Sequence, residues 1–377
     1  MTKHTDQKFI SYALNLAKKN LGTTAPNPVV GCVITKNNEI ISTGVTARDG
    51  RPHAEKIAID KVLSHKNGSQ LLENSSLYVT LEPCSHFGKT APCADLIIQN
   101  RISRVVIASK DPDSRVNGDG IKKLCDAGIE VVVGIMEKES QELNKGFFKA
   151  KKTGLPYVTL KLATSLDGKI ATKNFDSKWI TSEKARHFSH HLRATNDAIM
   201  VGSNTVRKDN PMLDCRISGL EEYSPKRVIV AGNINFDEEL KIFQTAKNIP
   251  TIILTYEQDY DFTNLKNLGV EVIFCQKIND QIDIKNALQK LYESGINSVL
   301  VEGGQNLATQ LLKENVIDEL IWIRNRKIIG DDGISGIGKM EFSNISETLR
   351  NFIKKDIFEL EEDLIEILVS PTGYTKT

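Results

Sequence analysis

Residues 76–100 read SLYVTLEPCSHFGKTAPCADLIIQN, a stretch that contains a strand, two cysteines and a short helix. Apolar side chains alternate from Ser76 to Leu81, which is typical of a strand with one buried face. Cys84 follows the end of that strand. Residues 94–100 read as a helix, so Cys93 would lie at its N-terminus, where the helix dipole favours a thiolate. This arrangement allows the two thiols to meet although eight residues separate them in the chain.

Upstream of this stretch, residues 53–55 read His-Ala-Glu. The imidazole of His53 and the thiolates of Cys84 and Cys93 make three ligands for zinc, and catalytic zinc sites commonly keep the fourth position for water. Glu55 suits proton transfer better than coordination beside soft thiolates. An H-x-E segment followed by P-C-x-x-C is the signature of zinc deaminases, in which the glutamate is not a ligand. The longer gap between the cysteines departs from that short form.

Two other interpretations of these residues stay open at this point. Cys84 and Cys93 could be ordinary buried thiols, or His86 could complete a closed structural zinc site. For the remaining four cysteines we favour buried thiols: Cys32, Cys125, Cys215 and Cys275.

The composition is that of a globular chain with room for two cores. It has 377 residues, of which 40% are hydrophobic and 26% are charged. The net charge of +1 gives no electrostatic footprint for nucleic acid, so no such partner is expected. The first residues form no apolar signal segment, and no run is long enough to cross a membrane. Dispersed cysteines fit a reducing cytoplasm.

Strand and helix patterns alternate in both halves, which predicts α/β domains with helices covering a sheet. A charged helix over 137–152 leads into a polar segment that ends in Gly154 and Pro156, so we place domains at 1–150 and 155–377. Strands are expected in the first domain at 29–34, 40–44, 76–81, 104–109 and 130–133. In the second they are expected at 157–163, 198–201, 227–231, 251–255, 270–274, 298–301, 319–323, 357–360 and 364–369.

The second half carries turn motifs in place of a metal pattern. A Gly pair in Val301–Asn306 enters a helix N-terminus and could bind phosphate, although such pairs are more often simple turns. Thr181 or Ser182 is a plausible N-cap for the helix that follows. Further polar turns lie at 165–169, 202–205 and 209–216. Most of these segments follow an expected strand end, at the edge where open α/β sheets place ligands.

Taken together, these residues closely resemble the bifunctional deaminase-reductase family of riboflavin biosynthesis. The resemblance covers nearly the whole chain, from residue 25 to the C-terminal strands, and two independent motif sets occur in the family's order. The segments that carry it are 25–31, 53–55, 82–93, 111–113, 117–120, 161–169, 177–181, 205–211 and 301–304.

The resemblance implies a cytidine-deaminase-like three-layer fold for the first domain and a dihydrofolate-reductase-like fold for the second. It implies two consecutive reactions on one phosphoribosylated pyrimidine. The first domain would use one zinc ion per chain to remove the 2-amino group of 2,5-diamino-6-(5-phosphoribosylamino)pyrimidin-4-one. The second would use NADPH to reduce the ribosyl group to ribityl. A homo-oligomer, either a dimer or a tetramer, is also expected.

The resemblance also implies roles for individual residues. Glu55 would be the catalytic acid and base beside the zinc ligands. The pyrimidine and its ribose phosphate would be held in the first domain by Asn27, Lys89, Asp111 and Asn117. NADPH would contact Ala163, Trp179, Thr205, Asp209 and the turn from Gly304. The reductase substrate would contact Ser177, Arg193, Leu213, Arg216 and Glu302. Lys161, in a strand centre, is either a buried-edge cation near this substrate or a solvated lysine.

Two positions depart from the family pattern. Thr46 stands where members often carry a histidine, so one substrate contact is either missing or supplied by Arg48. Arg324–Gly330 stands where a more apolar segment of the Ala-Pro-Lys type is usual. Local packing, and with it the cofactor pocket or a subunit contact, is therefore expected to differ here from that of other members.

Two rival functions remain open. One is a zinc deaminase of another base, in tRNA or in a free nucleotide, joined to an unrelated second domain. The near-neutral charge disfavours the tRNA version. The other rival is a non-catalytic zinc module joined to a nucleotide-binding sensor.

Overall fold

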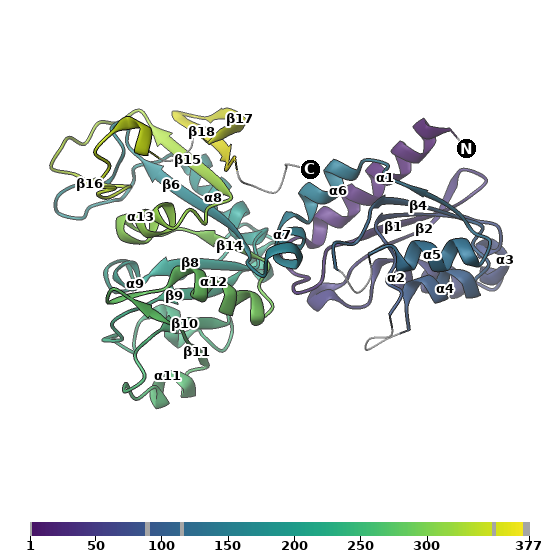
Figure 1. Ribbon diagram of the computed structural model, residues 1–377, viewed down its shortest axis with the longest axis horizontal. Coiled ribbons are helices and arrows are strands. Elements are labelled where there is room, and N and C mark those ends of the chain that lie inside the picture. Colours follow the sequence, from purple (N-terminus) through teal and green to yellow (C-terminus); the bar gives the residue numbers. More distant parts are fainter. Residues whose placement is uncertain (1, 87–90, 114–116, 349–351, 372–377) are drawn as a thin grey trace. The chain divides into compact units, whose positions relative to one another are not determined.

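The computed structural model describes residues 2–86, 91–113, 117–348 and 352–371 (Figure 1). The chain divides into two compact units, Met1–Thr153 and Gly154–Thr377. None of the helices in the described ranges has the length and apolar character needed to cross a membrane.

The first unit is built on a five-stranded sheet with the order β2-β1-β3-β4-β5. Its strands are β1 (Gly31–Lys36), β2 (Glu39–Val45), β3 (Ser76–Leu81), β4 (Arg104–Ser109) and β5 (Glu130–Val133). The pairs β1–β2 and β1–β3 are antiparallel, whereas β3, β4 and β5 run parallel. Every residue of β3 and β4 is buried, which requires cover on both faces of the sheet.

Helices supply that cover. They are α1 (Lys3–Ala17), α2 (Ala54–Leu63), α3 (Gly68–Leu72), α4 (Cys93–Gln99), α5 (Asp119–Asp126), α6 (Glu137–Leu143) and α7 (Lys145–Thr153), with 3₁₀ turns at Lys18–Asn20 and Arg48–Gly50. Phe9 of α1 packs on Tyr78 in a cluster that includes Val33. Cys32, the neighbour of Val33, pairs with Gly44 of β2, which faces Ala54 at the start of α2. Successive strand residues face opposite sides, so α1 and α2 cover opposite faces and the unit has three layers.

The second unit contains a nine-stranded sheet with the order β11-β10-β9-β8-β14-β6-β15-β18-β17. Its strands are β6 (Tyr157–Thr164), β8 (Ala198–Gly202), β9 (Lys226–Val230), β10 (Thr251–Thr255), β11 (Val270–Phe274), β14 (Ser298–Val301), β15 (Glu319–Asn325), β17 (Ile353–Leu360) and β18 (Asp363–Val369). The pairings from β11 through β15 are parallel, and β18 pairs antiparallel with β15 and β17. Two short ribbons join β7 (Lys169–Ala171) to β16 (Ile334–Ser335) and β12 (Lys277–Ile278) to β13 (Gln281–Ile282).

Alternate residues of these strands feed two cores on opposite faces. Met200 and Val228 pack with the helices α12 and α13, whereas Ile199 and Ile229 pack on the other side with Phe243 of α10. The helices of this unit are α8 (Glu183–Ala194), α9 (Ser203–Asp209), α10 (Lys241–Gln244), α11 (Thr263–Asn267), α12 (Ile284–Glu293) and α13 (Gln305–Lys313), with 3₁₀ turns at Glu221–Tyr223 and Ile345–Glu347.

The expected strands are all present, with ends shifted by up to four residues, but two helical predictions were wrong. The charged helix over 137–152 is divided into α6 and α7 at Asn144, whose side-chain amide exchanges two 2.9 Å hydrogen bonds with the backbone of Val29. This pairing draws the chain toward the sheet and ends α6. The segment after β8, expected as a polar turn, forms α9. Ser182 is the N-cap of α8, and its hydroxyl accepts the N–H of Ala185.

Candidate functional site

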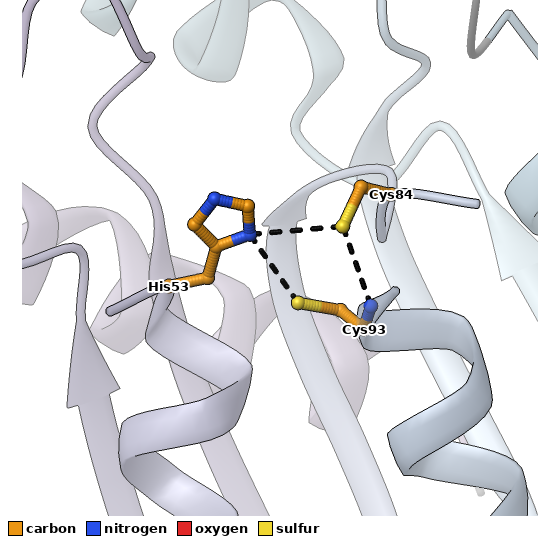
Figure 2. Close-up of side chains that lie close together, drawn as sticks. All are labelled: His53, Cys84 and Cys93. Atoms are coloured by element: carbon orange, nitrogen blue, oxygen red, sulfur yellow. Dashed lines mark hydrogen bonds between the residues drawn. The ribbon is translucent and has the colours of Figure 1, made fainter. Parts of the chain in front are cut away.

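The three predicted zinc ligands meet in the first unit (Figure 2). Their donor atoms all lie within 4.8 Å of one another. His53 Nδ1 is 3.7 Å from Cys84 Sγ and 3.4 Å from Cys93 Sγ. A tetrahedral zinc ion, with bonds of about 2.3 Å to sulfur and about 2.0 Å to nitrogen, places such ligands about 3.5 Å apart. The side chains therefore already have the spacing that zinc requires.

Three separate segments bring these ligands together. His53 is the N-cap of α2, Cys84 follows β3, and Cys93 is the first residue of α4. The backbone N–H of Cys93 donates to Cys84 Sγ at 3.3 Å, which joins the two thiols locally. In the described part of the chain the cluster has three members, and the exposed His86 is not one of them. The geometry favours a site with an open position over a closed structural site.

The protonation of Cys84 suits metal binding. Hydrogen bonds from the Cys93 thiol and from His53 lower the pKa of Cys84 to about 4, although burial opposes the shift. The thiolate is the form that binds metal. These hydrogen bonds therefore favour the thiolate form of Cys84.

Glu55 lies in the first turn of α2 and is only 4% exposed. Burial raises the pKa of its carboxyl to about 7, while His53 opposes the rise. Gly44 of β2 allows this placement, because a Cβ there would lie 2.0 Å from the carbonyl oxygen of Ala54. The start of α2 therefore rests directly on the sheet, and a buried carboxyl stands beside the ligand cluster.

The predicted substrate residues of the first unit that the structure describes lie in turns and loops. Asn27 donates to the carbonyl of Gly50 at 2.9 Å. Asp111 follows β4 and accepts the N–H of Asp113 at 2.8 Å, and burial raises its pKa to about 6. Asn117 is exposed. Lys89 lies outside the described residues.

Thr46 is buried, and its hydroxyl accepts the N–H of Val30 at 3.0 Å. Thr46, which stands where family members often carry a histidine, therefore has a structural role inside the sheet layer.

In the second unit, three predicted residues form one ionic network. Glu302 Oε1 accepts from Arg193 Nε at 2.8 Å. Glu302 Oε2 accepts from Arg193 Nη2 at 3.0 Å and from Lys161 Nζ at 3.5 Å. The side chains of Lys161, Arg193 and Glu302 are only 12–13% exposed. Burial would raise the pKa of Glu302, but the two cations lower it to about 2. Lys161 is thus a partly buried, paired cation and not a solvated one.

A loop after α9 closes on this network. Leu213 is buried with a φ of 54°, and Arg193 Nη1 donates to the carbonyl of Asp214 at 3.0 Å. The fully buried Arg227 donates to the carbonyl of Met212. Arg216 is exposed and lies 3.6 Å from the Asp214 carboxylate. The structure therefore binds the residue after Leu213 to Arg193 and leaves Arg216 at the surface.

Two of the predicted cofactor residues lie shortly after strand ends, Thr205 after β8 and Gly304 after β14. Thr205 and Gly304 are neighbours, since a Cβ on Gly304 would lie 3.7 Å from Thr205 Oγ1. Trp179 is 63% exposed, with the Arg186 guanidinium 4.2 Å from its ring centre. Ala163 lies in β6, Asp209 is exposed at the end of α9, and Ser177 is exposed in the segment before Trp179.

The unusual segment Arg324–Gly330 is well anchored. Lys327 Nζ donates to the carbonyl of Trp179 at 2.7 Å, and the N–H groups of Ile329 and Gly330 donate to the Asp167 carboxylate. Asn325 donates to Asp363 at 2.7 Å. The departure from an apolar pattern therefore leaves no packing defect at these described contacts.

Sequence analysis gave no role to Glu82, which is 4% exposed and accepts several backbone N–H groups. The available signal was an acidic residue placed directly after an apolar strand and before Pro83-Cys84.

Comparison with known proteins places both units in known families. Residues 3–109 match the cytidine and deoxycytidylate deaminase zinc-binding region, and residues 156–365 match the RibD C-terminal domain. The riboflavin biosynthesis protein RibD of Aquifex aeolicus is 41% identical over 97% of this chain and 98% of its own length. The chain belongs to the RibD family.

Two solved structures agree over the full length. An Acinetobacter baumannii RibD is 35% identical, with a TM-score of 0.87 over 98% of this chain and 99% of that one. A diaminohydroxyphosphoribosylaminopyrimidine deaminase/5-amino-6-(5-phosphoribosylamino)uracil reductase from Thermotoga maritima is 35% identical, with a TM-score of 0.86 over 97% of this chain and 99% of that one.

These matches confirm the predicted fold class and enzyme class. The chain is a bifunctional deaminase and reductase of riboflavin biosynthesis, with a cytidine-deaminase zinc-binding domain and a dihydrofolate-reductase-like domain. The deaminase region holds the His53, Cys84 and Cys93 cluster, and the reductase domain implies a reduced nicotinamide cofactor.

Proposed function

We propose that this chain catalyses two consecutive steps on one small phosphoribosylated pyrimidine. The first unit, with domain limits 1–150, deaminates 2,5-diamino-6-(5-phosphoribosylamino)pyrimidin-4-one. The second, with limits 155–377, reduces the ribosyl group of the product to ribityl with NADPH. The observation that carries this proposal is the preformed cluster of His53, Cys84 and Cys93 beside a buried Glu55, in a chain that aligns end to end with RibD proteins.

In the deaminase half, His53, Cys84 and Cys93 would hold one zinc ion per chain. Bound zinc supplies hydroxide at neutral pH by lowering the pKa of water to about 7. Glu55 would carry two protons in turn, the first from the attacking water to the ring nitrogen and the second from the new C–OH group to the leaving amine, which departs as ammonia. Its raised pKa of about 7 lets it both accept and release a proton near neutral pH.

The substrate of the first step would be held by four side chains. Asn27, Asp111 and Asn117 offer hydrogen bonds to the pyrimidine and the ribose, and Lys89 offers a cation for the phosphate. Asp111 would act as an acceptor once it is ionised, above a pH of about 6.

In the reductase half, NADPH supplies the hydride. We propose that Lys161 and Glu302 face the open-chain sugar, while Arg193 keeps Glu302 ionised and in place. Arg193 and Arg216 have the forked donors that suit a phosphate. Ser177 and Leu213 complete the substrate contacts. NADPH would lie against Ala163, Trp179, Thr205, Asp209 and Gly304.

The same proposal places the enzyme in the cytoplasm as a homo-oligomer, with NADPH preferred over NADH and with no nucleic-acid or membrane partner.

The test is a coupled assay with the diaminopyrimidine substrate, in which ammonia and NADPH are followed in one cuvette. We expect ammonia release to precede NADPH oxidation, with one equivalent of each per substrate. Ammonia release from tRNA or from a free nucleotide, and none from the diaminopyrimidine, would refute the proposal. The absence of NADPH oxidation on the deaminated intermediate would refute its second half.

A further inference from the structure

Glu82 is a buried carboxylate bonded to backbone amides. It lies between β3 and the ligand Cys84 and is 4% exposed. Its Oε1 accepts the N–H groups of Gly118 at 3.0 Å, Gly120 at 3.0 Å and Ile121 at 3.3 Å. Its Oε2 accepts from Asp111 at 3.2 Å and also from Gly118 at 3.1 Å. Within the described ranges, each hydrogen bond to this carboxylate comes from a backbone N–H.

These amides mark the two ends of one loop. Asp111 begins the loop after β4, and Gly118, with a φ of 96°, is the N-cap of α5. Asn117 directly precedes Gly118. A single carboxylate therefore binds the N–H of Asp111 and the N–H of Gly118, the residue next to Asn117.

A close packing contact supports the same attachment. A Cβ on Gly120 would lie 2.1 Å from the carbonyl oxygen of Pro83 and 3.2 Å from Glu82 Oε1. The first turn of α5 therefore lies directly against the segment that leads into Cys84. A side chain at this position would push the helix away, so the contact and the hydrogen bonds both hold the start of α5 against Pro83.

We propose that Glu82 is a positioning residue for deamination, which holds Asp111 and Asn117 in a fixed relation to the zinc ligand Cys84. The inference rests on the proposed function, because Asp111 and Asn117 are substrate contacts only there. Glu82 touches no reacting atom. A carboxylate accepts at both oxygens, whereas a glutamine would turn an NH₂ group toward one set of these buried N–H donors.

The experiment compares Glu82→Gln with Glu139→Gln, a matched change at an exposed position of α6. In Glu82→Gln we expect the deaminase KM to rise about tenfold or more, because buried donors lose their acceptor. Zinc content and kcat should change far less, and NADPH oxidation on the deaminated intermediate should stay at the wild-type rate. Glu139→Gln should match the wild type in every measurement.

Amide hydrogen exchange supplies a readout that does not depend on activity. Exchange over residues 117–121 should be faster in Glu82→Gln, with peptides of the second unit unchanged. If Glu82→Gln fails to fold, Gly120→Ala tests the same attachment through the Pro83 contact and should give the same rise in KM.

A wild-type KM and wild-type exchange in a folded variant would overturn the inference. So would a loss of kcat or zinc at constant KM, which indicates a general structural role. A wild type without deaminase activity would instead refute the proposed function, and the exchange data would still decide whether Glu82 holds the loop.

Discussion

At the scale of single residues, both sites place charged groups where burial would disfavour them and then offset the cost locally. Glu302 stays ionised because two cations contact it. Cys84 favours the thiolate because Cys93 and His53 donate to it. Burial dominates at Glu55, where the opposing charge among the described residues is that of His53, and the pKa rises to about 7. The same burial therefore produces an anion in two cases and a proton carrier in the third.

Replacing Glu55 by glutamine should separate proton transfer from metal binding. We expect Glu55→Gln to keep zinc, because the three ligands remain, while ammonia release falls by about a hundredfold or more. Metal analysis together with an ammonia assay provides the measurement. The variant should still oxidise NADPH on the deaminated intermediate. Loss of zinc from a folded variant would contradict the role assigned to Glu55, and full biological function would favour the zinc-sensor alternative.

Glu302 should make the second unit sensitive to acid. Its pKa is lowered in the folded state, so its contribution to the free energy of unfolding is complete above its ordinary pKa of 4.5 and is lost as the pH falls toward 2. In Glu302→Gln, which is less stable at neutral pH, the free energy of unfolding should therefore fall less steeply as the pH drops through this range. Circular dichroism followed during acid unfolding provides the measurement. Equal slopes for the variant and the wild type would show that the ion pair contributes nothing.

At the scale of elements, the metal cluster depends on where two helices begin. His53 caps α2 and Cys93 starts α4, while Cys84 follows the central strand β3. The sequence predicted the start of α4 to within one residue. The distance of α2 from the sheet, however, is set by Gly44, whose missing side chain lets the Ala54 carbonyl approach β2.

Gly44→Ala should therefore weaken zinc binding without changing a ligand. The added Cβ would lie 2.0 Å from the Ala54 carbonyl oxygen, so the start of α2 must move and carry His53 with it. We expect zinc affinity to fall at least about tenfold, as for other changes that disturb the support of ligands, in a competition titration with a chelator. Gly202→Ala is the matched control, because a Cβ there meets nothing within 4 Å. Equal affinities for the two variants would contradict this account.

At the scale of the whole molecule, two units with separate hydrophobic cores carry different chemistry. The zinc ligands belong to the first unit, and the Lys161, Arg193 and Glu302 network belongs to the second. Metal removal should therefore affect one reaction only.

Treatment with a zinc chelator should stop ammonia release and leave NADPH oxidation on the deaminated intermediate near its original rate. Adding zinc back should restore the first activity. The measurement is the coupled assay run in two halves, each with its own substrate. Loss of both activities after chelation would show that the reductase unit also depends on the metal.

Sequence patterns predicted the α/β class, the strands, the cluster of His53, Cys84 and Cys93 and the family, because apolar periodicity and motif spacing can be read along the chain. The folded structure was needed to find the partners of Lys161, the hydrogen bonds of the Arg324–Gly330 segment and the division of the connecting helix at Asn144. It alone revealed that Glu82 binds amides up to 39 residues away. These features depend on hydrogen bonds and charges between distant segments, and burial gives them their strength, so local patterns did not specify their partners.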